Sequence, residues 1–193
     1  AVSVYCDAPY HPSYGPLLLM APHLRRARLG PAAISLARMP PIDIAANTAL
    51  LAGLAAGGVY VGIARGAWLA DYGLTEVTPP LQAIREAVAI VRYLLSGEVG
   101  GYMGKVYNLA KHTCAPYPIP DALPPVMIGT WGQKLAALAG EIADEVKVGG
   151  SANPDMVAVM RDTIAAGERR AGRQPGSVRV VLGAVTVVDE DRD

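Results

Sequence analysis

Apolar positions along the chain recur with two periods, one typical of helices and one of buried strands. Leu81, Ile84, Val88, Val91 and Leu95 follow one another at spacings of three and four residues, which predicts a helix with one buried face. Four other segments also have helical patterns: 17–24, 42–54, 135–143 and 153–170.

Short apolar runs bounded by glycine or proline predict strands between these helices. The runs lie near residues 2–6, 29–36, 59–64, 125–129, 145–148 and 178–188. Because helices separate most of them, the pattern favours an α/β protein with a parallel sheet and right-handed crossovers. A closed eight-stranded barrel typically needs ~250 residues. The chain has 193 residues, so we expect either a small open sheet or an incomplete barrel.

Composition excludes several classes of protein. The chain is 52% hydrophobic, is 18% charged and has no net charge, which is not the composition of a disordered segment. Nucleic-acid binding needs a basic patch, and the scattered arginines do not supply one. No apolar run approaches the ~18 residues that span a membrane. We expect one domain, residues 1–193, with a small glycine- and proline-rich excursion around 98–123.

The cysteines and the first 30 residues indicate the cellular compartment of the protein. Cys6 and Cys114 are too few for a disulfide framework and are expected to be reduced thiols. Residues 1–30 show no charged segment followed by an apolar segment, so no signal peptide is expected. The sequence therefore predicts a cytoplasmic protein.

Two glycine turns follow predicted strands and precede predicted helices. Such turns expose backbone N–H groups at a helix N-terminus, where an anion is stabilised. As a plain alternative, each is only a turn that uses the conformational freedom of glycine. The candidate residues are Gly129, Thr130, Trp131 and Gly132 in the first turn and Gly149, Gly150 and Ser151 in the second.

Other chemistry is sparse. His11 is a candidate acid or base, although a histidine in a loop is more often a hydrogen-bonding surface group. The spacing of His, Cys and Asp matches no metal site. The sequence contains neither a Gly-x-Ser-x-Gly elbow nor a phosphate loop of the GxxxxGK[ST] type.

Six segments, taken in order, resemble the bacterial luciferase-like flavin and deazaflavin oxidoreductases, and most strongly the coenzyme F420-dependent branch that includes methylenetetrahydromethanopterin reductase. These segments are 59–69 (VYVGIARGAWL), 85–92 (REAVAIVR), 98–107 (EVGGYMGKVY), 124–130 (PPVMIGT), 139–146 (AGEIADEV) and 149–154 (GGSANP). The similarity covers nearly all of residues 28–188.

The resemblance implies a (β/α)8 TIM barrel. In that fold, helix 1 and strand 2 would lie between Cys6 and Pro16, where there is no room for them, and strand 8 would follow Asp193. We therefore expect an incomplete barrel in this chain, either truncated or only partly represented.

The resemblance also implies a cofactor site on the carboxyl ends of the strands. Ala32, Ala33 and Ser35 match a segment with a non-proline cis bond that backs the cofactor ring. Ala64, Arg65 and Gly66 end the next strand, where Arg65 either contacts the cofactor or only ties loops together. Some relatives carry an acidic residue at the position of Ala67. The glycine turns at 129–132 and 149–151 would hold the phosphate.

The implied function is hydride transfer between coenzyme F420 and a small organic substrate, with a C=N or C=C acceptor. Two alternatives stay open. One is an FMN-dependent monooxygenase that uses reduced flavin and O₂, and the other is a non-catalytic barrel that binds flavin or nothing. Members of the family are commonly dimers, and segments 17–24 and 42–54 are candidates for that interface.

Overall fold

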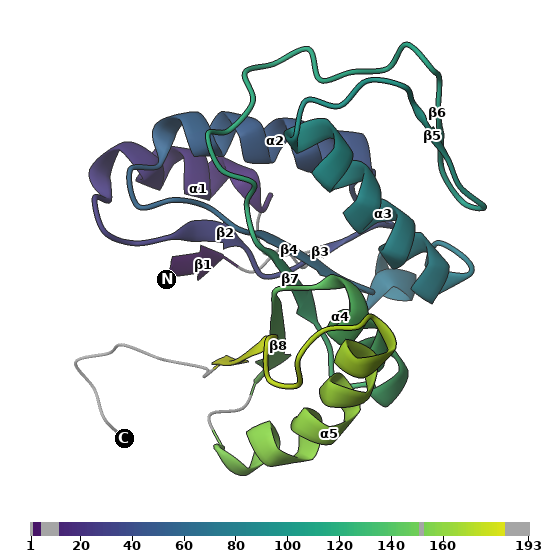
Figure 1. Ribbon diagram of the computed structural model, residues 1–193. Helices are drawn as coiled ribbons and strands as arrows, with labels where there is room; N and C mark the ends of the chain where they lie inside the picture. Colours follow the sequence, from purple (N-terminus) through teal and green to yellow (C-terminus); the bar gives the residue numbers. More distant parts are fainter. Residues whose placement is uncertain (1, 5–11, 151–152, 184–193) are drawn as a thin grey trace.

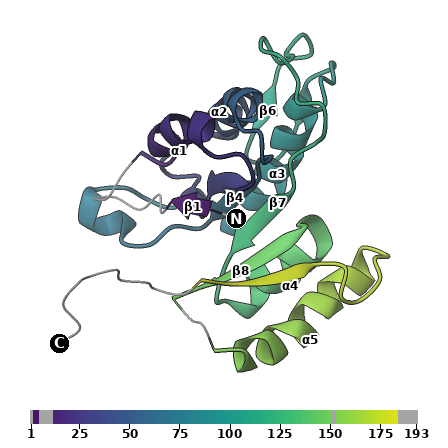
Figure 2. The ribbon, with the colours of Figure 1, turned by 90° about the vertical axis from the view of Figure 1, so that its left-hand side faces the viewer.

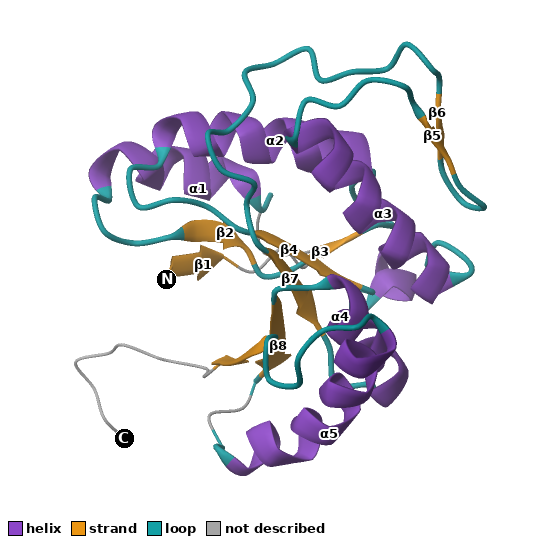
Figure 3. Cartoon of the chain, in the orientation of Figure 1, coloured by secondary structure: helices purple, strands orange, loops and turns teal. Residues whose placement is uncertain are grey.

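The computed structural model describes residues 2–4, 12–150 and 153–183, which form a curved sheet flanked by helices (Figures 1 and 3). The strands are β1 Val2–Val4, β2 Leu29–Pro31, β3 Ile34–Ser35, β4 Val61–Ala64, β5 Tyr102–Met103, β6 Asn108–Leu109, β7 Val126–Gly129, β8 Glu145–Gly149 and β9 Arg179–Gly183. The helices are α1 Tyr14–Met20, α2 Pro41–Leu54, α3 Pro80–Leu95, α4 Gln133–Ile142 and α5 Asp155–Arg170, with 3-10 turns η1 Ala21–His23 and η2 Leu69–Tyr72.

The main strands are parallel and follow one another in space in the order of the chain. β1 pairs with β2, and the second sheet has the order β3-β4-β7-β8-β9. A parallel bridge between Leu29 and Val59 links the two sheets. A doubly wound sheet would reverse its strand order at a switch point. The order seen here is the winding of a barrel, and the predicted parallel sheet is confirmed.

The predicted strand 29–36 is interrupted, which the apolar pattern did not reveal. A cis peptide bond joins Ala32 to Ala33 between β2 and β3, as the family resemblance implied. The end of β2 lies against β4 so closely that a Cβ atom on Gly62 would overlap the carbonyl oxygen of Pro31. The short approach therefore requires glycine at position 62.

The two faces of the sheet have different neighbours. Figures 1 and 2 show the helices along one side of the curved sheet and the strands bare on the other. Val61 and Ile63 of β4 belong to the large core that includes the helices, as do Val146 and Val148 of β8. A second, small cluster contains Ala32, Tyr60 and Met127, with Val181 against it. Strand residues thus alternate between the helical side and the concave side.

A buried ion cluster occupies the concave face near the amino ends of the strands. Glu145 is fully buried, and its carboxylate pairs with Arg28 and with Arg179, each at 2.7 Å. The guanidinium of Arg28 also lies over the ring of Tyr60, 5.0 Å from its centroid. A buried carboxylate is tolerated only when it is paired and hydrogen-bonded, and two arginines supply this.

Helices α4 and α5 approach each other through glycine. A Cβ atom on Gly140 of α4 would overlap the carbonyl oxygen of Ile164, and one on Gly167 of α5 would overlap that of Ala137. The two helical backbones therefore touch directly, as small residues at a helix crossing allow.

The predicted excursion contains the antiparallel hairpin β5–β6, which is anchored on α3 by one carboxylate. Glu86 is only 1% exposed, and it accepts hydrogen bonds from the backbone N–H groups of Lys105, Val106 and Tyr107 at 2.7–2.9 Å. Burial alone would raise the pKa of Glu86. The hydrogen bonds from Gln82 and from the three N–H groups outweigh burial and lower this pKa to about 2.

Some predictions fall on residues that the structure does not describe. These are His11, Ser151, the segment between Cys6 and Pro12, and the part of the last strand beyond Gly183. In the described part of the chain, no helix combines the length and the apolar character needed to cross a membrane.

Candidate functional site

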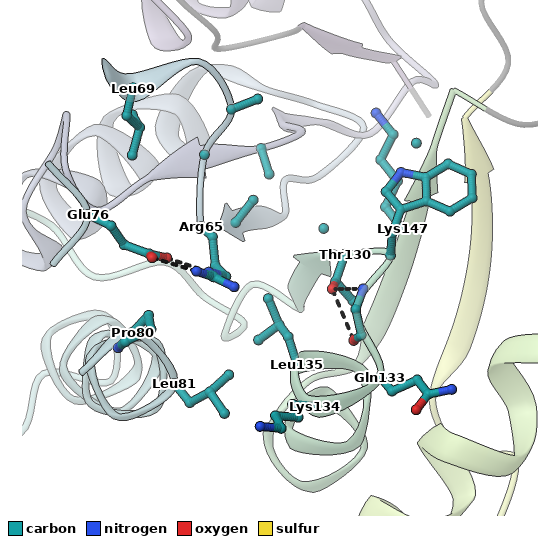
Figure 4. Close-up of a pocket in the computed structure, with 18 of the residues that line it drawn as sticks. Arg65, Leu69, Glu76, Pro80, Leu81, Thr130, Gln133, Lys134, Leu135 and Lys147 are labelled. Atoms are coloured by element: carbon teal, nitrogen blue, oxygen red, sulfur yellow. Dashed lines mark hydrogen bonds and ion pairs between the residues drawn. The ribbon is translucent and has the colours of Figure 1, made fainter. Parts of the chain in front are cut away.

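A cavity of about 1170 Å³ opens at the carboxyl ends of β4, β7 and β8, where the barrel winding predicts a site (Figure 4). Most of the predicted site residues line it. They are Ala32, Ala33, Ala64, Arg65, Gly66, Gly129, Thr130, Trp131, Gly132, Gly149 and Gly150. The remaining wall comes from the start of α3 with Pro79 before it, from the first turn of α4, and from Lys147. Ala67, Leu69 of η2 and Glu76, which lie between β4 and α3, complete it.

The floor of the cavity is made of small residues. Ala33, Ala64 and Gly129 come from three neighbouring strands or turns and meet closely. A Cβ atom on Gly129 would lie 3.4 Å from that of Ala64 and 3.5 Å from that of Ala33. The floor is therefore closely packed and carries no side chain larger than a methyl group. Such a surface suits a flat ligand that stacks against backbone and methyl groups.

The first turn of α4 forms one side of the cavity. Gln133, Lys134 and Leu135 line the cavity there, and the first N–H groups of a helix have no acceptor within the helix. The hydroxyl oxygen of Thr130 accepts a hydrogen bond from the N–H of Gly132 at 2.9 Å, which shapes the turn before the helix. This arrangement offers donors to an anion.

Arg65 is held by Glu76 across the mouth of the cavity. The guanidinium donates through Nε and through a terminal nitrogen, the latter at 2.6 Å from the Glu76 carboxylate (Figure 4). This hydrogen bonding and the attraction between the charges raise the pKa of Arg65 above its ordinary value. The pair joins the end of β4 to the segment before α3, so Arg65 ties these loops together and also lines the cavity.

Ser35 was predicted as a site residue, but it lies behind the residues that line the cavity and does not line it itself. Its side chain is buried, and its hydroxyl donates to the carbonyl oxygen of Arg65 at 2.7 Å. The same hydroxyl accepts from the N–H of Ala37 at 3.3 Å. Ser35 therefore fixes the turn that carries Arg65 and Gly66.

Lys147 is a cavity residue that sequence reasoning missed. It lies on the concave face of β8, is only 8% exposed, and donates to the carbonyl oxygen of Ala32 at 3.2 Å. A signal was present in the sequence, because Glu145 and Lys147 alternate with Val146 and Val148 on a strand predicted to be buried. Two charged residues on one face of such a strand indicate a polar interior at that point.

No metal site accompanies the cavity within residues 2–4, 12–150 and 153–183, where no group of three or more His, Cys, Asp and Glu side chains is placed to hold an ion. His11 and Ser151 lie outside the described residues. Trp131 contributes to the wall, whereas Trp68 and Tyr72 are exposed and do not line the cavity.

Comparison with known proteins gives consistent matches. The family model for luciferase-like monooxygenases matches residues 6–193. The chain is 31% identical over 184 residues to the 5,10-methylenetetrahydromethanopterin reductase of Archaeoglobus fulgidus, covering 93% of this chain and 53% of the relative. The chain spans about half the length of this curated relative.

Two solved structures resemble the fold. The coenzyme F420-dependent tetrahydromethanopterin reductase of Methanopyrus kandleri has a TM-score of 0.82 and 25% identity, over 92% of this chain and 55% of that one. An F420-dependent secondary alcohol dehydrogenase in complex with an F420–acetone adduct has a TM-score of 0.78 and 20% identity, over 93% and 59%. These likenesses confirm the luciferase-like TIM-barrel fold, of which the described strands form an unclosed part. The chain belongs to the luciferase-like monooxygenase family, as its sequence segments predicted.

Proposed function

We propose that the protein is an F420-dependent oxidoreductase that moves a hydride between the deazaflavin and a small organic substrate. The observation that carries the proposal is the cavity itself, in which a low floor of Ala33, Ala64 and Gly129 adjoins the first turn of α4. A flat ring fits the floor, and a phosphate fits the helix N-terminus. When bound, the cofactor would supply the redox chemistry, and the protein would orient it and set its electrostatic surroundings.

The residues proposed to contact the cofactor are the predicted ones, with one change of role. Ser35 is proposed to position the turn at Arg65 instead of contacting the ring. His11 is proposed as an acid or base toward the substrate. The proposed cofactor contacts are Ala32, Ala33, Ala64, Arg65, Gly66, Gly129, Thr130, Trp131, Gly132, Gly149, Gly150 and Ser151. A substrate with a C=N or C=C bond is proposed because the curated relative is a reductase.

Two other functions have support. An FMN-dependent monooxygenase is favoured by the description of the family. A barrel that binds a cofactor without catalysis is favoured by Ala67, which lines the cavity and offers no proton-transfer group.

Cofactor content separates the three functions. The protein is purified, any cofactor is released by denaturation, and its fluorescence spectrum distinguishes F420 from FMN. We expect F420 to be released, or to be bound in a titration of the purified protein. Recovery and binding of FMN alone would favour the monooxygenase, and binding without any turnover would favour the non-catalytic barrel. Binding of neither cofactor would refute the proposal.

Replacing Thr130 by valine tests the turn at α4. We expect Thr130→Val to weaken cofactor binding by about 1–2 kcal/mol, because the hydroxyl is lost both as a donor to the cofactor and as the acceptor from Gly132. Thr130→Ser keeps the hydroxyl and should bind as the wild type does. Both dissociation constants come from fluorescence titration. An unchanged affinity in the valine variant would show that the turn at 129–132 only connects β7 to α4 and does not bind the cofactor through Thr130.

Residues 1–193 are also proposed to form one partial barrel domain in a cytoplasmic homodimer. Leu19 of α1 and Leu50 of α2 are exposed by 78% and 56%, and Ile42 and Leu54 of α2 are also exposed. Apolar side chains gathered on two adjacent helices suit an interface between copies. Sedimentation equilibrium of the purified protein measures this directly.

A further inference from the structure

The segment 66–75, which connects β4 to the residues before α3, forms part of the cavity wall but stands outside the hydrophobic core. Gly66, Ala67 and Leu69 of this segment line the cavity. None of the residues 65–80 is buried, and among the described residues no member of 66–75 belongs to the core or packs against it. A segment with so little buried apolar surface costs little free energy to displace.

The segment is nevertheless a compact unit. Its backbone hydrogen bonds join its own residues, with the N–H of Leu74 donating to the carbonyl oxygen of Leu69 at 2.9 Å and the N–H of Gly73 to that of Ala70 at 3.0 Å. The ion pair between Arg65 and Glu76 ties its two ends together (Figure 4). A loop that is closed at its base and bonded within itself can move as one body without unfolding.

Trp68 has a conformation that the ligand-free protein does not explain. Within the described part of the chain it is the only residue other than glycine with a positive φ, at 52°, and a bulky side chain rarely adopts this left-handed conformation. Packing does not compensate for the strain, because the indole is 61% exposed. Strain of this kind is typical of functional segments. The neighbours on both sides, Ala67 and Leu69, line the cavity, which relates Trp68 to a ligand held there.

We propose that residues 66–75 form a lid that closes over a ligand in the cavity, and that Trp68 is the side chain that covers this ligand. The inference rests on the proposed function, because the ligand is the F420 or FMN of that proposal together with its substrate. The Arg65–Glu76 pair is the clamp at the base of the lid. A closed lid keeps water away from the hydride that is transferred, and it slows the release of the ligand.

Limited proteolysis tests the lid without any measurement of activity. Chymotrypsin cuts after aromatic residues, and the lid offers it two exposed ones, Trp68 and Tyr72. We expect the ligand-free protein to be cut there, and saturating F420 to slow this cut by about tenfold or more, because a ligand stabilises the form that binds it. Fragment masses locate the cut, and FMN is tested in the same way. A bound cofactor that leaves the rate of cutting unchanged would overturn the lid.

Replacing Trp68 by asparagine tests the covering side chain. Asparagine tolerates a positive φ, so Trp68→Asn should unfold at the same temperature as the wild type or at a higher one. We expect the cofactor to dissociate from it about fivefold faster in stopped-flow fluorescence, with little change in the association rate constant. Trp68→Phe keeps an aromatic ring and should stay within about twofold of the wild type.

Val99→Asn is the matched control for this change. It also replaces an exposed apolar side chain, 69% exposed, but one that does not line the cavity and that lies in the excursion around 98–123. Its dissociation rate should equal that of the wild type. An unchanged dissociation rate in folded Trp68→Asn would overturn the role of Trp68.

Glu76→Gln tests the clamp, because it removes the charge that pairs with Arg65. The ligand-free variant should be cut by chymotrypsin at 68–72 about threefold faster than the wild type, since its lid is held less firmly at the base. An equal rate would overturn the clamp.

Failure of the lid and failure of the proposed function give different results. A protein that binds F420 or FMN without protection from chymotrypsin refutes the lid and leaves the proposed function intact. A protein that binds neither cofactor refutes the proposed function, and the lid with it.

Discussion

Replacing Gly167 by alanine is expected to destabilise the protein by about 3 kcal/mol. The new methyl group would overlap the carbonyl oxygen of Ala137 on α4, and backbone cannot rotate away as a flexible side chain can. The two helices would have to separate along their whole crossing. Urea unfolding, followed by circular dichroism, gives the change in the free energy of unfolding.

Gly53 provides the matched control for this change. It also lies within a helix, α2, but nothing stands within 4 Å of the position that its Cβ atom would take. Gly53→Ala should therefore stabilise the protein by about 0.5–1 kcal/mol, since alanine has the higher helix propensity. Equal effects of the two substitutions would show that the contact between α4 and α5 is looser than described.

Glu86→Gln is expected to cost about 3 kcal/mol and to release the β5–β6 hairpin from α3. An amide at this position has one acceptor oxygen in place of two, and its NH₂ group would face backbone donors at 105–107. Glu98→Gln, an exposed change in the same excursion, should stay within about 0.5 kcal/mol of the wild type. Hydrogen exchange at residues 102–109 would report whether the hairpin opens.

The Glu86 carboxylate also makes the stability of the protein depend on pH, in a direction that its pKa determines. The pKa of Glu86 is lowered from its ordinary value of 4.5 to about 2, so the unfolded chain takes up the proton first as the pH falls. The contribution to stability is complete above about pH 5 and disappears as the pH falls through about 2. This contribution to the free energy of unfolding is on the order of 3 kcal/mol, because each pKa unit corresponds to about 1.36 kcal/mol. In Glu86→Gln this part of the acid profile should vanish, and a profile identical to that of the wild type would contradict the assignment.

Much of this architecture can be predicted from the sequence because it depends on local patterns. The spacing from Leu81 to Leu95 locates α3, and the short apolar runs locate β4, β7 and β8 within two residues of their ends. The glycine turns that line the cavity stand next to those runs. Each of these features needs only a few consecutive residues, and their order in the chain indicates the family.

What the sequence did not predict depends on contacts between distant segments. The close approach of Gly62 to the carbonyl oxygen of Pro31 joins residues that are remote along the chain. Ser35 turned out to stand behind the wall because Arg65 places its carbonyl there. Lys147 was passed over because its role follows from a contact with Ala32, 115 residues away. Periodicity describes which face a residue occupies, but not what stands opposite that face.

The anchoring of the β5–β6 excursion by a single carboxylate has a consequence for how the protein tolerates changes in length. The excursion lengthens the connection between α3 and β7, yet doubling a loop costs only about 0.6 kcal/mol in closure entropy. Among the described residues, those that line the cavity all come from outside 98–123. Changes of length in the excursion that keep the N–H groups of 105–107 on Glu86 are therefore expected to leave both the winding of the sheet and the shape of the site intact.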